Sequence, residues 1–438
     1  MRALRVNFSY SIISMNVATS RNVSRRDFLF QCGAAVASVA AGAGCRGLDR
    51  ARPASASPEK LLFTSHGRTA MIHADGSGLR YFDFQVENQV TWQPGPLLSD
   101  GRHMIFLSME ERRDGPGRPF DKYYHHTPTH LWLYDFENDQ LTEICTRDRL
   151  AVFYTPALLL SDERLLVQVV RDEGGQIFSM NLDGSDAREF TQLGEGLPYG
   201  LSLRPDGQRV AYHLASPQGY QIWTSDLNGA DKVKVAAHPD LLYFGPRWSP
   251  DGSWLLFQAC QFKADPGHDW SDVCIARPDG SELRMLTQDQ AMWFGATYGN
   301  PETRGGGSNI AEWTRAGRIL FPRRLPDSKV PWEYQSNRPD VDHFNRDFKP
   351  QLARGGTEIC RLNPADGTME SVTSSLPPNW DFRASESSSG KWIAFCRAGT
   401  GGVPELNVMA ADGSASHALT RGWEERGVDH PRWLPMST

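Results

Sequence analysis

The sequence predicts an all-β fold, a seven-bladed β-propeller closed by its C-terminal strand, and three observations lead to this prediction. Two families of tight turns alternate along residues 60–435, copies of the second family recur at near-regular spacing, and the last segment of the chain resembles the start of an internal repeat. The composition agrees, because 40 Gly and 28 Pro among 438 residues suit many short strands joined by turns.

The first turn family places Gly after Asp or Ser, directly before an alternating apolar strand. Its clearest copies are Ser99-Asp100-Gly101, Pro205-Asp206-Gly207, Pro250-Asp251-Gly252 and Ser389-Gly390. The second family lies inside a later hairpin, at positions 75, 138, 183, 228, 279, 366 and 412. Asp-Gly and Asn-Gly supply the positive φ that tight hairpins require.

One repeat therefore holds four strands and two hairpins. Three of the intervals between second-family turns are about 45 residues, and the longer intervals contain insertions. A four-stranded repeat of this length is typical of propeller blades. Seven second-family turns predict seven blades.

The amino-acid sequences of the repeats resemble those of a known family. The segment WSPDGSWLLF from Trp248, followed by a hairpin containing DGSELRMLT, is similar to the repeats of TolB-like, WD-type propellers. Such repeats occur in the Tol envelope protein, in the propellers of prolyl oligopeptidases and in oligogalacturonate lyases. The resemblance covers roughly residues 60–435, and it implies the fold while leaving the function open.

The ends of the repeat region predict how the ring closes. The first repeat begins midway, at residues 61–65, without an innermost strand. The segment Asp429-His430-Pro431-Arg432-Trp433 resembles the inner-strand segment Phe244-Gly245-Pro246-Arg247-Trp248. We expect the C-terminus to supply the missing strand and so to cover an otherwise free edge. The expected domains are an export segment and linker at 1–56 and the propeller at 57–438.

The export segment resembles a twin-arginine (Tat) signal peptide. Ser24-Arg25-Arg26-Asp27-Phe28-Leu29 precedes an Ala/Gly-rich stretch that ends near Gly44. This resemblance implies Tat export to the periplasm or cell envelope, with no stable membrane span after signal removal. Cleavage after Ala43 and cleavage after Ala56 both stay open, as does a lipid anchor on Cys45, whose preceding residues match a lipobox poorly.

Charge and motif content narrow the function classes. The net charge of the chain is −6. Residues 1–56 have a net charge of +6, so the remaining residues have a net charge of −12. An acidic domain lacks the basic surface that nucleic-acid binding requires. Seven Cys without a CxxC pair exclude a zinc knuckle, and we expect the five beyond the export segment to be buried. The absence of a GxSxG elbow argues against a serine hydrolase.

Four insertions point to one face of the propeller. Segments 110–129, 261–272, 291–309 and 325–357 all belong to connections on the face where the innermost strands begin. Loops on a rigid scaffold commonly carry binding residues. We expect the ligand in the central funnel at this face, held by inner-strand residues Tyr199, Arg247, Asp381, Arg383, His430 and Arg432, with Glu302, Arg304, Asn309 and Glu312 as a second set.

The chemistry of these residues leaves alternatives open. The guanidinium groups of these arginines can bind a ligand carboxylate, but they can also form a structural ring of ion pairs with nearby acidic residues. Likewise, the aromatic residues Trp92, Phe244 and Trp380 can simply bury apolar area.

We favour a binding or scaffold module of the cell envelope, a monomer that needs no cofactor and binds an envelope protein or an oligosaccharide. The alternative is a metal-assisted polysaccharide lyase of the oligogalacturonate type, acting by β-elimination. The resemblance implies a funnel metal, such as manganese, held by His430 with His125, His126, His268 or His343 from the insertions. Catalysis itself is left open.

Replacing both Arg25 and Arg26 with Lys is expected to leave the precursor in the cytoplasm, because the Tat pathway reads the arginine pair. Cell fractionation with immunoblotting measures this, and Arg21→Lys serves as the control outside the pair. Normal export of the double variant would contradict the localisation.

Overall fold

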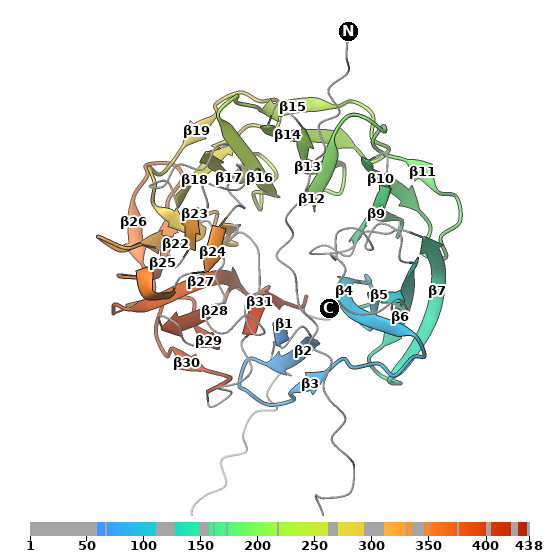
Figure 1. Cartoon of the computed structure of the whole chain (residues 1–438), viewed down its shortest axis with the longest axis horizontal. Helices are drawn as coiled ribbons and strands as arrows, with labels where there is room; N and C mark the ends of the chain where they lie inside the picture. Colours follow the sequence, from blue (N-terminus) through green and yellow to red (C-terminus); the bar gives the residue numbers. More distant parts are fainter. Residues whose placement is uncertain are drawn as a thin grey trace, which may run out of the picture.

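The computed structural model describes residues 59–65, 68–110, 128–148, 157–160, 163–171, 174–216, 219–261, 270–292, 311–329, 332–334, 346–348, 350–374, 376–399, 404–421 and 428–435. Residues 1–58, and with them the export segment and the predicted boundary at 56/57, lie outside this part. Figure 1 shows the strands grouped in sheets around a central axis, a propeller-like, all-β arrangement.

Four separate four-stranded antiparallel sheets make up part of the ring. From the axis outward they contain β31 (Val428–Trp433), β1 (Lys60–Ser65), β2 (Arg68–His73) and β3 (Arg80–Tyr81); β4 (Gln89–Leu97), β5 (His103–Glu110), β6 (Pro128–Asp135) and β7 (Gln140–Asp148); β8 (Ala157–Leu159), β9 (Leu165–Arg171), β10 (Gly174–Met180) and β11 (Arg188–Glu189); and β12 (Leu197–Leu203), β13 (Arg209–Ser216), β14 (Gly219–Asp226) and β15 (Val233–Ala236).

The other strands of the ring belong to one 13-stranded sheet that contains three further runs of four antiparallel strands. These are β16 (Leu241–Trp248), β17 (Leu255–Gln261), β18 (Trp270–Ala276) and β19 (Arg284–Met285); β21 (Glu312–Trp313), β22 (Ile319–Arg324), β25 (Thr357–Leu362) and β26 (Met369–Ser371); and β27 (Asn379–Glu386), β28 (Trp392–Gly399), β29 (Glu405–Ala410) and β30 (His417–Ala418). The short strand β20 (Ala291–Met292) joins the first two runs. We call each run of four strands a unit, named by its inner strand.

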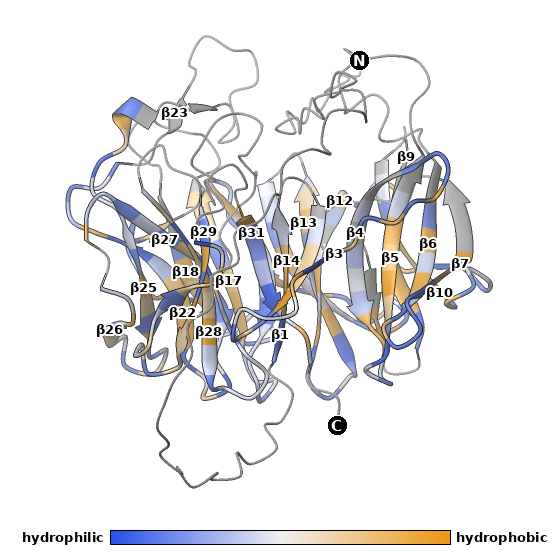
Figure 2. Ribbon diagram, turned by 90° about the horizontal axis from the view of Figure 1, so that it is seen from below, coloured by the Kyte–Doolittle hydropathy of each residue, from blue (hydrophilic) through white to orange (hydrophobic). Residues whose placement is uncertain are grey.

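Part of the insertion between β22 and β25 is described. It contains the hairpin β23 (Trp332–Tyr334) and β24 (Arg346–Phe348) and the 3-10 turn η1 (Pro350–Leu352). Figure 2 shows β23 beyond the strand ends at one side of the ring. No helix in the described residues is long and apolar enough to cross a membrane.

The Asp-Gly turns form because the Asp side chain caps its own turn. In the β16 unit, Ser281 N donates to Asp279 Oδ1 at 2.9 Å, and Gly280 follows the Asp with φ +85°. The same contact recurs at Asp75, Asp183, Asp366 and Asp412. These hydrogen bonds lower the pKa of each carboxyl below its usual value. Both predicted turn families are present, so the predicted local structure is confirmed where it is described.

The core lies between neighbouring units. Apolar side chains of alternate strand positions pack into several clusters; the largest joins Leu61, Phe244, Trp380 and Val428 from three units. Figure 2 shows the apolar positions running along the strands. The side chains of Cys260, Cys274, Cys360 and Cys396 are buried, as expected, while the side chain of Cys145 lies outside the described part.

Four inner strands share one distortion. Gly200, Gly245, Arg383 and His430 have φ of 64°, 65°, 57° and 52°, and each lies at or beside a register shift in its unit. Glycine adopts this left-handed conformation without strain at positions 200 and 245. At Gly200 a Cβ would also approach His213 Nδ1 to 2.9 Å. This bulge re-aims the inner-strand side chains next to it.

Tryptophans join successive units at the same level. Trp248 Nε1 donates to Ser202 O at 3.0 Å, Trp313 Nε1 to Arg247 O at 3.1 Å, and Trp433 Nε1 to Ser385 O at 2.9 Å. Trp248 and Trp433 follow the bulge of their own unit, and all three tryptophans reach the inner strand of the preceding unit. Each indole therefore buries area and donates to a carbonyl at or beside the bulge of the preceding unit.

The C-terminal strand β31 pairs antiparallel with β1. Leu61 is opposite Trp433 and Ser65 is opposite Val428, with a register shift between them. Leu434 N donates to Lys60 O at 2.9 Å beyond the ladder. β31 thus occupies the inner position of its unit.

Truncation after Val428 is expected to lower the melting temperature by several degrees or to cause aggregation, because β1 loses its partner and exposes an unpaired edge. Thermal unfolding with light scattering measures this. Truncation after Pro435 is the matched control, since it keeps all of β31. An unchanged melting temperature after Val428 truncation would contradict the importance of this pairing.

His213 supports the inner strand of the next unit and makes stability depend on pH. Gly245 N donates to His213 Nδ1 at 3.4 Å, and the imidazole stacks on Tyr220 at 5.7 Å. Burial, followed by the charge of Arg247, lowers the pKa of His213 to about 3. Between about pH 6.5 and this value the unfolded chain binds a proton that the folded chain does not, so this group destabilises the fold as pH falls.

His213→Gln is therefore expected to lose less stability between pH 7 and pH 4 than the unmodified chain does. Denaturant unfolding at several pH values measures the difference. His417→Gln, an exposed position, is the control and should keep the original pH dependence. Identical pH dependence of the His213 variant and the unmodified chain would contradict a buried neutral imidazole.

Candidate functional site

The insertions and the inner strands begin at the same face of the ring. In each unit, tight turns join the first strand to the second and the third to the fourth at one face, which we call the turn face. Because antiparallel strands alternate in direction, the gaps after β5, β17 and β22, and the gap before β21, open at the opposite, insertion face. This matches the topology expected from the sequence.

The predicted charged residues lie deeper along the axis than the sequence suggested. Arg247 is the seventh of eight residues in β16, and Arg432 is the fifth of six in β31. Glu312 directly precedes Trp313 and the next turn. These three therefore lie toward the turn-face ends of the inner strands, whereas Arg383 and His430 lie at mid-strand bulges. The expectation that these residues hold a ligand at the insertion face stays a prediction.

Arg383 and the C-terminal strand form a buried ion pair. Arg383 Nε donates to Asp429 Oδ1 at 2.6 Å, and the two side chains are 8% and 6% exposed. His430 N donates to the same oxygen at 2.8 Å, and His430 Nδ1 lies 3.4 Å from Asp429 Oδ2. Breaking a buried pair by removing one partner costs about 3–5 kcal/mol. The pair therefore fixes β31 against β27 as well as placing charge near the axis.

His430 and Arg432 are enclosed without being fully sealed. The His430 side chain is 35% exposed, yet burial, together with Arg383, lowers its pKa to about 4, against the opposing effect of Asp429. Burial lowers the pKa of Arg432 to about 10. Arg432 Nη2 donates to Pro94 O at 2.8 Å and to Gly95 O at 3.3 Å, which links β31 to the inner strand β4.

A second charged group lies on the β16 and β21 units. Arg247 Nη1 donates to Pro246 O at 3.1 Å. The positive charge of Arg247 acts to lower the pKa of the His213 imidazole and of the Glu312 carboxyl. Burial raises the pKa of the Glu312 carboxyl, and the positive charge of Arg247 opposes this rise. Since Trp313 binds Arg247 O, the peptide of Glu312 is fixed beside that of Arg247. Glu312 was only in the second set of predicted residues.

Asp381 does not open onto the axis. Its side chain is fully buried and accepts from Arg397 Nε at 2.6 Å and Arg397 Nη2 at 2.7 Å, and Thr357 Oγ1 donates to its carbonyl at 2.6 Å. Asp381 is therefore a structural ion-pair residue within its unit. Tyr199 lies in β12 opposite His213, but its side chain is outside the described part. Glu302, Arg304 and Asn309 lie outside the described residues altogether.

The inner-strand aromatics bury area. Phe244 and Trp380 belong to the largest core cluster, and Trp92 packs with Phe84 at 4.9 Å and Trp132 at 5.6 Å. Trp380 stacks on Trp270 with ring centroids 6.2 Å apart. Of the two interpretations left open by the sequence, packing describes these three residues.

The donors near His430 do not fit a metal. Asp429, the adjacent carboxylate, is bound to Arg383, and no group of three His, Cys, Asp or Glu suited to a metal occurs in the described residues. A divalent transition metal needs several neutral imidazoles or carboxylates. The insertion histidines His125, His126, His268 and His343 lie outside the described residues.

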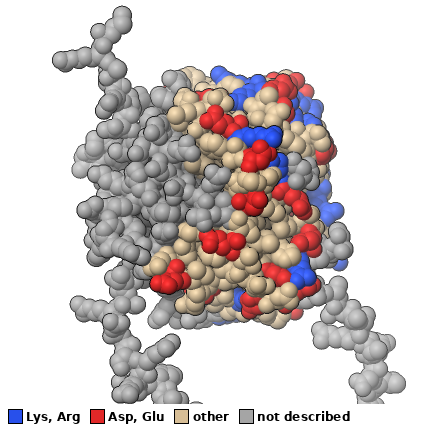
Figure 3. All heavy atoms as spheres, turned by 90° about the vertical axis from the view of Figure 1, so that its right-hand side faces the viewer, with Lys and Arg blue, Asp and Glu red and all other residues tan. Residues whose placement is uncertain are grey.

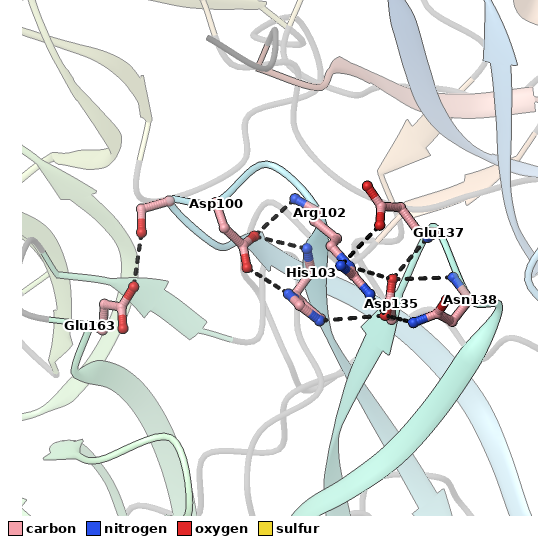
Figure 4. Close-up of polar contacts among 8 residues, drawn as sticks. Asp100, Arg102, His103, Asp135, Glu137, Asn138 and Glu163 are labelled. Carbon is pink, nitrogen blue, oxygen red and sulfur yellow. Dashed lines mark hydrogen bonds and ion pairs between the residues drawn. The ribbon is translucent and has the colours of Figure 1, made fainter.

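The turn face carries a different kind of polar cluster. Figure 4 shows Arg102 between Asp135 and Glu137, and His103 beside Asp100. The distance from His103 Nδ1 to Asp100 Oδ2 is 2.5 Å. Arg102 Nε donates to Asp135 Oδ1 at 2.9 Å; this side chain and the turn amides hold the pKa of Asp135 far below its usual value. Ser99 Oγ donates to Glu163 in the next unit at 2.8 Å. These groups cap turns, connect the two turns of the β4 unit or join two units, so this cluster is structural.

Figure 3 shows acidic and basic side chains interspersed over the described part of one side of the ring. Charged side chains of the described residues form ion pairs between strands and turns, as in Arg164–Asp186 at 2.9 Å and Arg209–Asp231 at 2.6 Å. Exposed pairs contribute little each, about 0–1 kcal/mol.

No protein-family model matches the chain, and no curated protein matches it in sequence. Among solved structures, a puromycin hydrolase has a TM-score of 0.52 and 13% identity, covering 84% of this chain and 52% of that one, so this chain spans about half its length. An oligogalacturonate lyase from Vibrio parahaemolyticus has a TM-score of 0.48 and 14% identity, covering 83% of this chain and 86% of that one. TolB from Acinetobacter baumannii has a TM-score of 0.39 and 14% identity, covering 76% and 83%.

The similar solved structures thus include TolB proteins and oligogalacturonate lyases, two of the groups in which repeats of this kind occur. At 13–14% identity the likeness concerns the fold alone. The chain has an all-β, propeller-like fold, and its function has to be argued from its own site.

Proposed function

We propose that this chain is an exported, seven-bladed β-propeller that acts as a binding or scaffold module of the bacterial cell envelope and holds its ligand at the ring axis. The observation that carries the proposal is the gathering of charged side chains on inner strands: Arg247, Glu312, Arg383, Asp429 and Arg432. Burying charge is costly, so charges kept in an enclosed place often serve binding.

The blade count rests on the units. Four separate sheets and three runs within the 13-stranded sheet give seven units of the same order and direction. The pairing of β31 with β1 supports closure by the C-terminal strand. The ordered Trp-to-carbonyl bonds between successive units fit one continuous ring.

The site itself supports an anionic or polar ligand. Arg247 donates to the backbone carbonyl of Pro246, and Arg432 donates to backbone carbonyls of β4. Guanidinium groups of this kind bind carboxylate through charged hydrogen bonds, each contributing about 1.5–3 kcal/mol. Arg383 is less suited to contact a ligand directly, because Asp429 already holds it.

Export and partner identity remain part of the proposal. The Arg25-Arg26 pair supports Tat export, and the resemblance to envelope propellers supports an envelope protein or an oligosaccharide as partner. We propose a monomer that needs no cofactor for this role.

The test is a binding panel of oligosaccharides, including uronate oligomers, and envelope proteins. For a ligand found there, His430→Ala is expected to weaken binding about tenfold, or ~1.4 kcal/mol. Asp183→Ala, in a turn-face hairpin, is the control and should bind as the unmodified chain does. A loss of binding in the Asp183 variant with none in the His430 variant would place the site elsewhere. Unsaturated sugar product from uronate oligomers would instead favour the lyase alternative.

A further inference from the structure

Arg247 and Glu312 lie beside each other on the inner strands of neighbouring units. Arg247 is near the end of β16, and Glu312 begins β21 in the next unit. Trp313 Nε1 donates to Arg247 O at 3.1 Å, so the two peptides are held at one level of the ring. The charge of Arg247 also acts on the Glu312 carboxyl. The two side chains therefore interact across the boundary between two units.

No ion pair engages either of these two side chains. Arg247 Nη1 donates to Pro246 O at 3.1 Å, which is an uncharged acceptor. Within the described part of the chain, Arg247 has no carboxylate at ion-pair distance, and Glu312 has no basic side chain at that distance. By contrast, Arg383 on the inner strand β27 is already paired with Asp429. The Arg247 guanidinium therefore keeps the capacity to bind an anionic group.

Both side chains keep contact with solvent. Arg247 is one of two partly exposed residues of β16, whose other six are buried, and Glu312 is partly exposed as well. Burial nevertheless raises the pKa of the Glu312 carboxyl, and the charge of Arg247 opposes the rise. A carboxyl that protein surrounds while solvent still reaches it faces an enclosed, hydrated space, where charges interact more strongly than in bulk water.

The other charged groups on the strands packed against β21 are already engaged. β21 packs against β16, β22 and β27, and Arg247 is the only charged residue of β16. Each charged residue of the other two strands has its own contact: Arg323 bonds to Glu358, Arg324 stacks on Trp270, Asp381 bonds to Arg397, Arg383 bonds to Asp429, and Glu386 accepts from Arg315 N.

His213 also faces the charge of Arg247, but it does not titrate near neutral pH. Burial, followed by that charge, lowers the pKa of its imidazole to about 3. Glu312 is therefore the group beside Arg247 that can exchange a proton at higher pH.

We propose that Arg247 and Glu312 form a proton-coupled anion site, in which an anionic group of the ligand binds Arg247 while Glu312 takes up a proton. The proposal rests on the proposed function, that the ligand binds at the axis, and it adds the regulation of that site by pH. An anionic ligand is held in acidic surroundings and released as the pH rises.

Binding and protonation are linked because the anion changes the charge that acts on Glu312. An anion against Arg247 cancels the positive charge that favours the ionised carboxylate and adds a repulsive negative charge. The pKa of the Glu312 carboxyl therefore rises further on binding. Since one proton is exchanged, the affinity for the anion falls with rising pH by at most about tenfold per pH unit.

Bromide NMR of the purified full chain tests the proposal, because bromide has no proton of its own to exchange in this pH range. The part of the ⁸¹Br line broadening that Arg247→Gln removes measures bromide bound at Arg247, with the same sodium bromide concentration at every pH. This part is expected to be at least about threefold larger at pH 5.5 than at pH 9, where the ionised carboxylate competes with the anion for Arg247.

Variants of matched shape assign the pH dependence. Glu312→Gln imitates the protonated carboxyl and should keep its pH 5.5 broadening at pH 9. Glu282→Gln, an exposed carboxylate that accepts from Arg277 Nε at 3.2 Å, is the control and should keep the pH dependence of the unmodified chain. Arg247→Lys keeps the positive charge and should retain pH-dependent broadening, which separates loss of charge from loss of fold in Arg247→Gln.

The outcomes separate the two claims. Broadening that Arg247→Gln removes equally at pH 5.5 and pH 9 would overturn the proton coupling and leave the axial anion site in place. PH dependence that persists in Glu312→Gln would overturn the role of Glu312. Broadening that neither Arg247 variant alters at any pH would overturn the anion site at the axis, and the proposed function with it.

Discussion

The hydrogen bond from a tryptophan indole to a carbonyl of the preceding inner strand is the constraint on which the ring depends. Each such bond joins two units at the level where the inner strand is distorted, as Trp313 does with Arg247 O. The carbonyl lies at or beside the bulge, and the neighbouring unit supplies the donor, so the bond ties two units together next to the distortion. A unit that lost its tryptophan would lose both a packed ring and a satisfied carbonyl.

The same bulge determines what reaches the axis. Two units place glycine at the left-handed position, whereas the β27 and β31 units place Arg383 and His430 there, with φ of 57° and 52°. A non-glycine residue in this conformation costs about 1 kcal/mol or more. Such strain is kept where the side chain has a use, and here the two residues meet at Asp429. The ion pair fixes β31 in its place and leaves His430 partly exposed beside Arg432.

Much of the fold could be predicted from the sequence, because its turns carry a local signal. Asp-Gly turns can be recognised in the sequence because residues such as Asp279 cap their own turn with the side-chain carboxylate. A second repeat signal was missed: in four of the units a Thr after the fourth strand accepts a backbone N–H from fourteen residues earlier, as from Val273 N to Thr287 Oγ1. The same bond recurs at Thr191, Thr373 and Thr420. The threonines were visible in the sequence, but their partners are tertiary.

The site was less predictable, since it depends on the depth of each residue along a strand and on cross-strand partners. Asp381 and Arg383 have the same parity in β27, so alternation alone assigns them to one side. The register shift between Phe382 and Ser385 breaks that period, and Arg397, directly opposite Asp381, takes its carboxylate. Glu312 was undervalued because its unit begins with a two-residue inner strand after a long insertion. Neither effect can be predicted from the local sequence.

The most direct test of an anion-binding axis is a crystal structure of the chain soaked in bromide, with the ion located by its anomalous signal. The account predicts a bromide at the axis in contact with Arg247 or Arg432, where an enclosed guanidinium is held in place. Bromide found only at exposed outer arginines such as Arg188, with none at the axis, would contradict it.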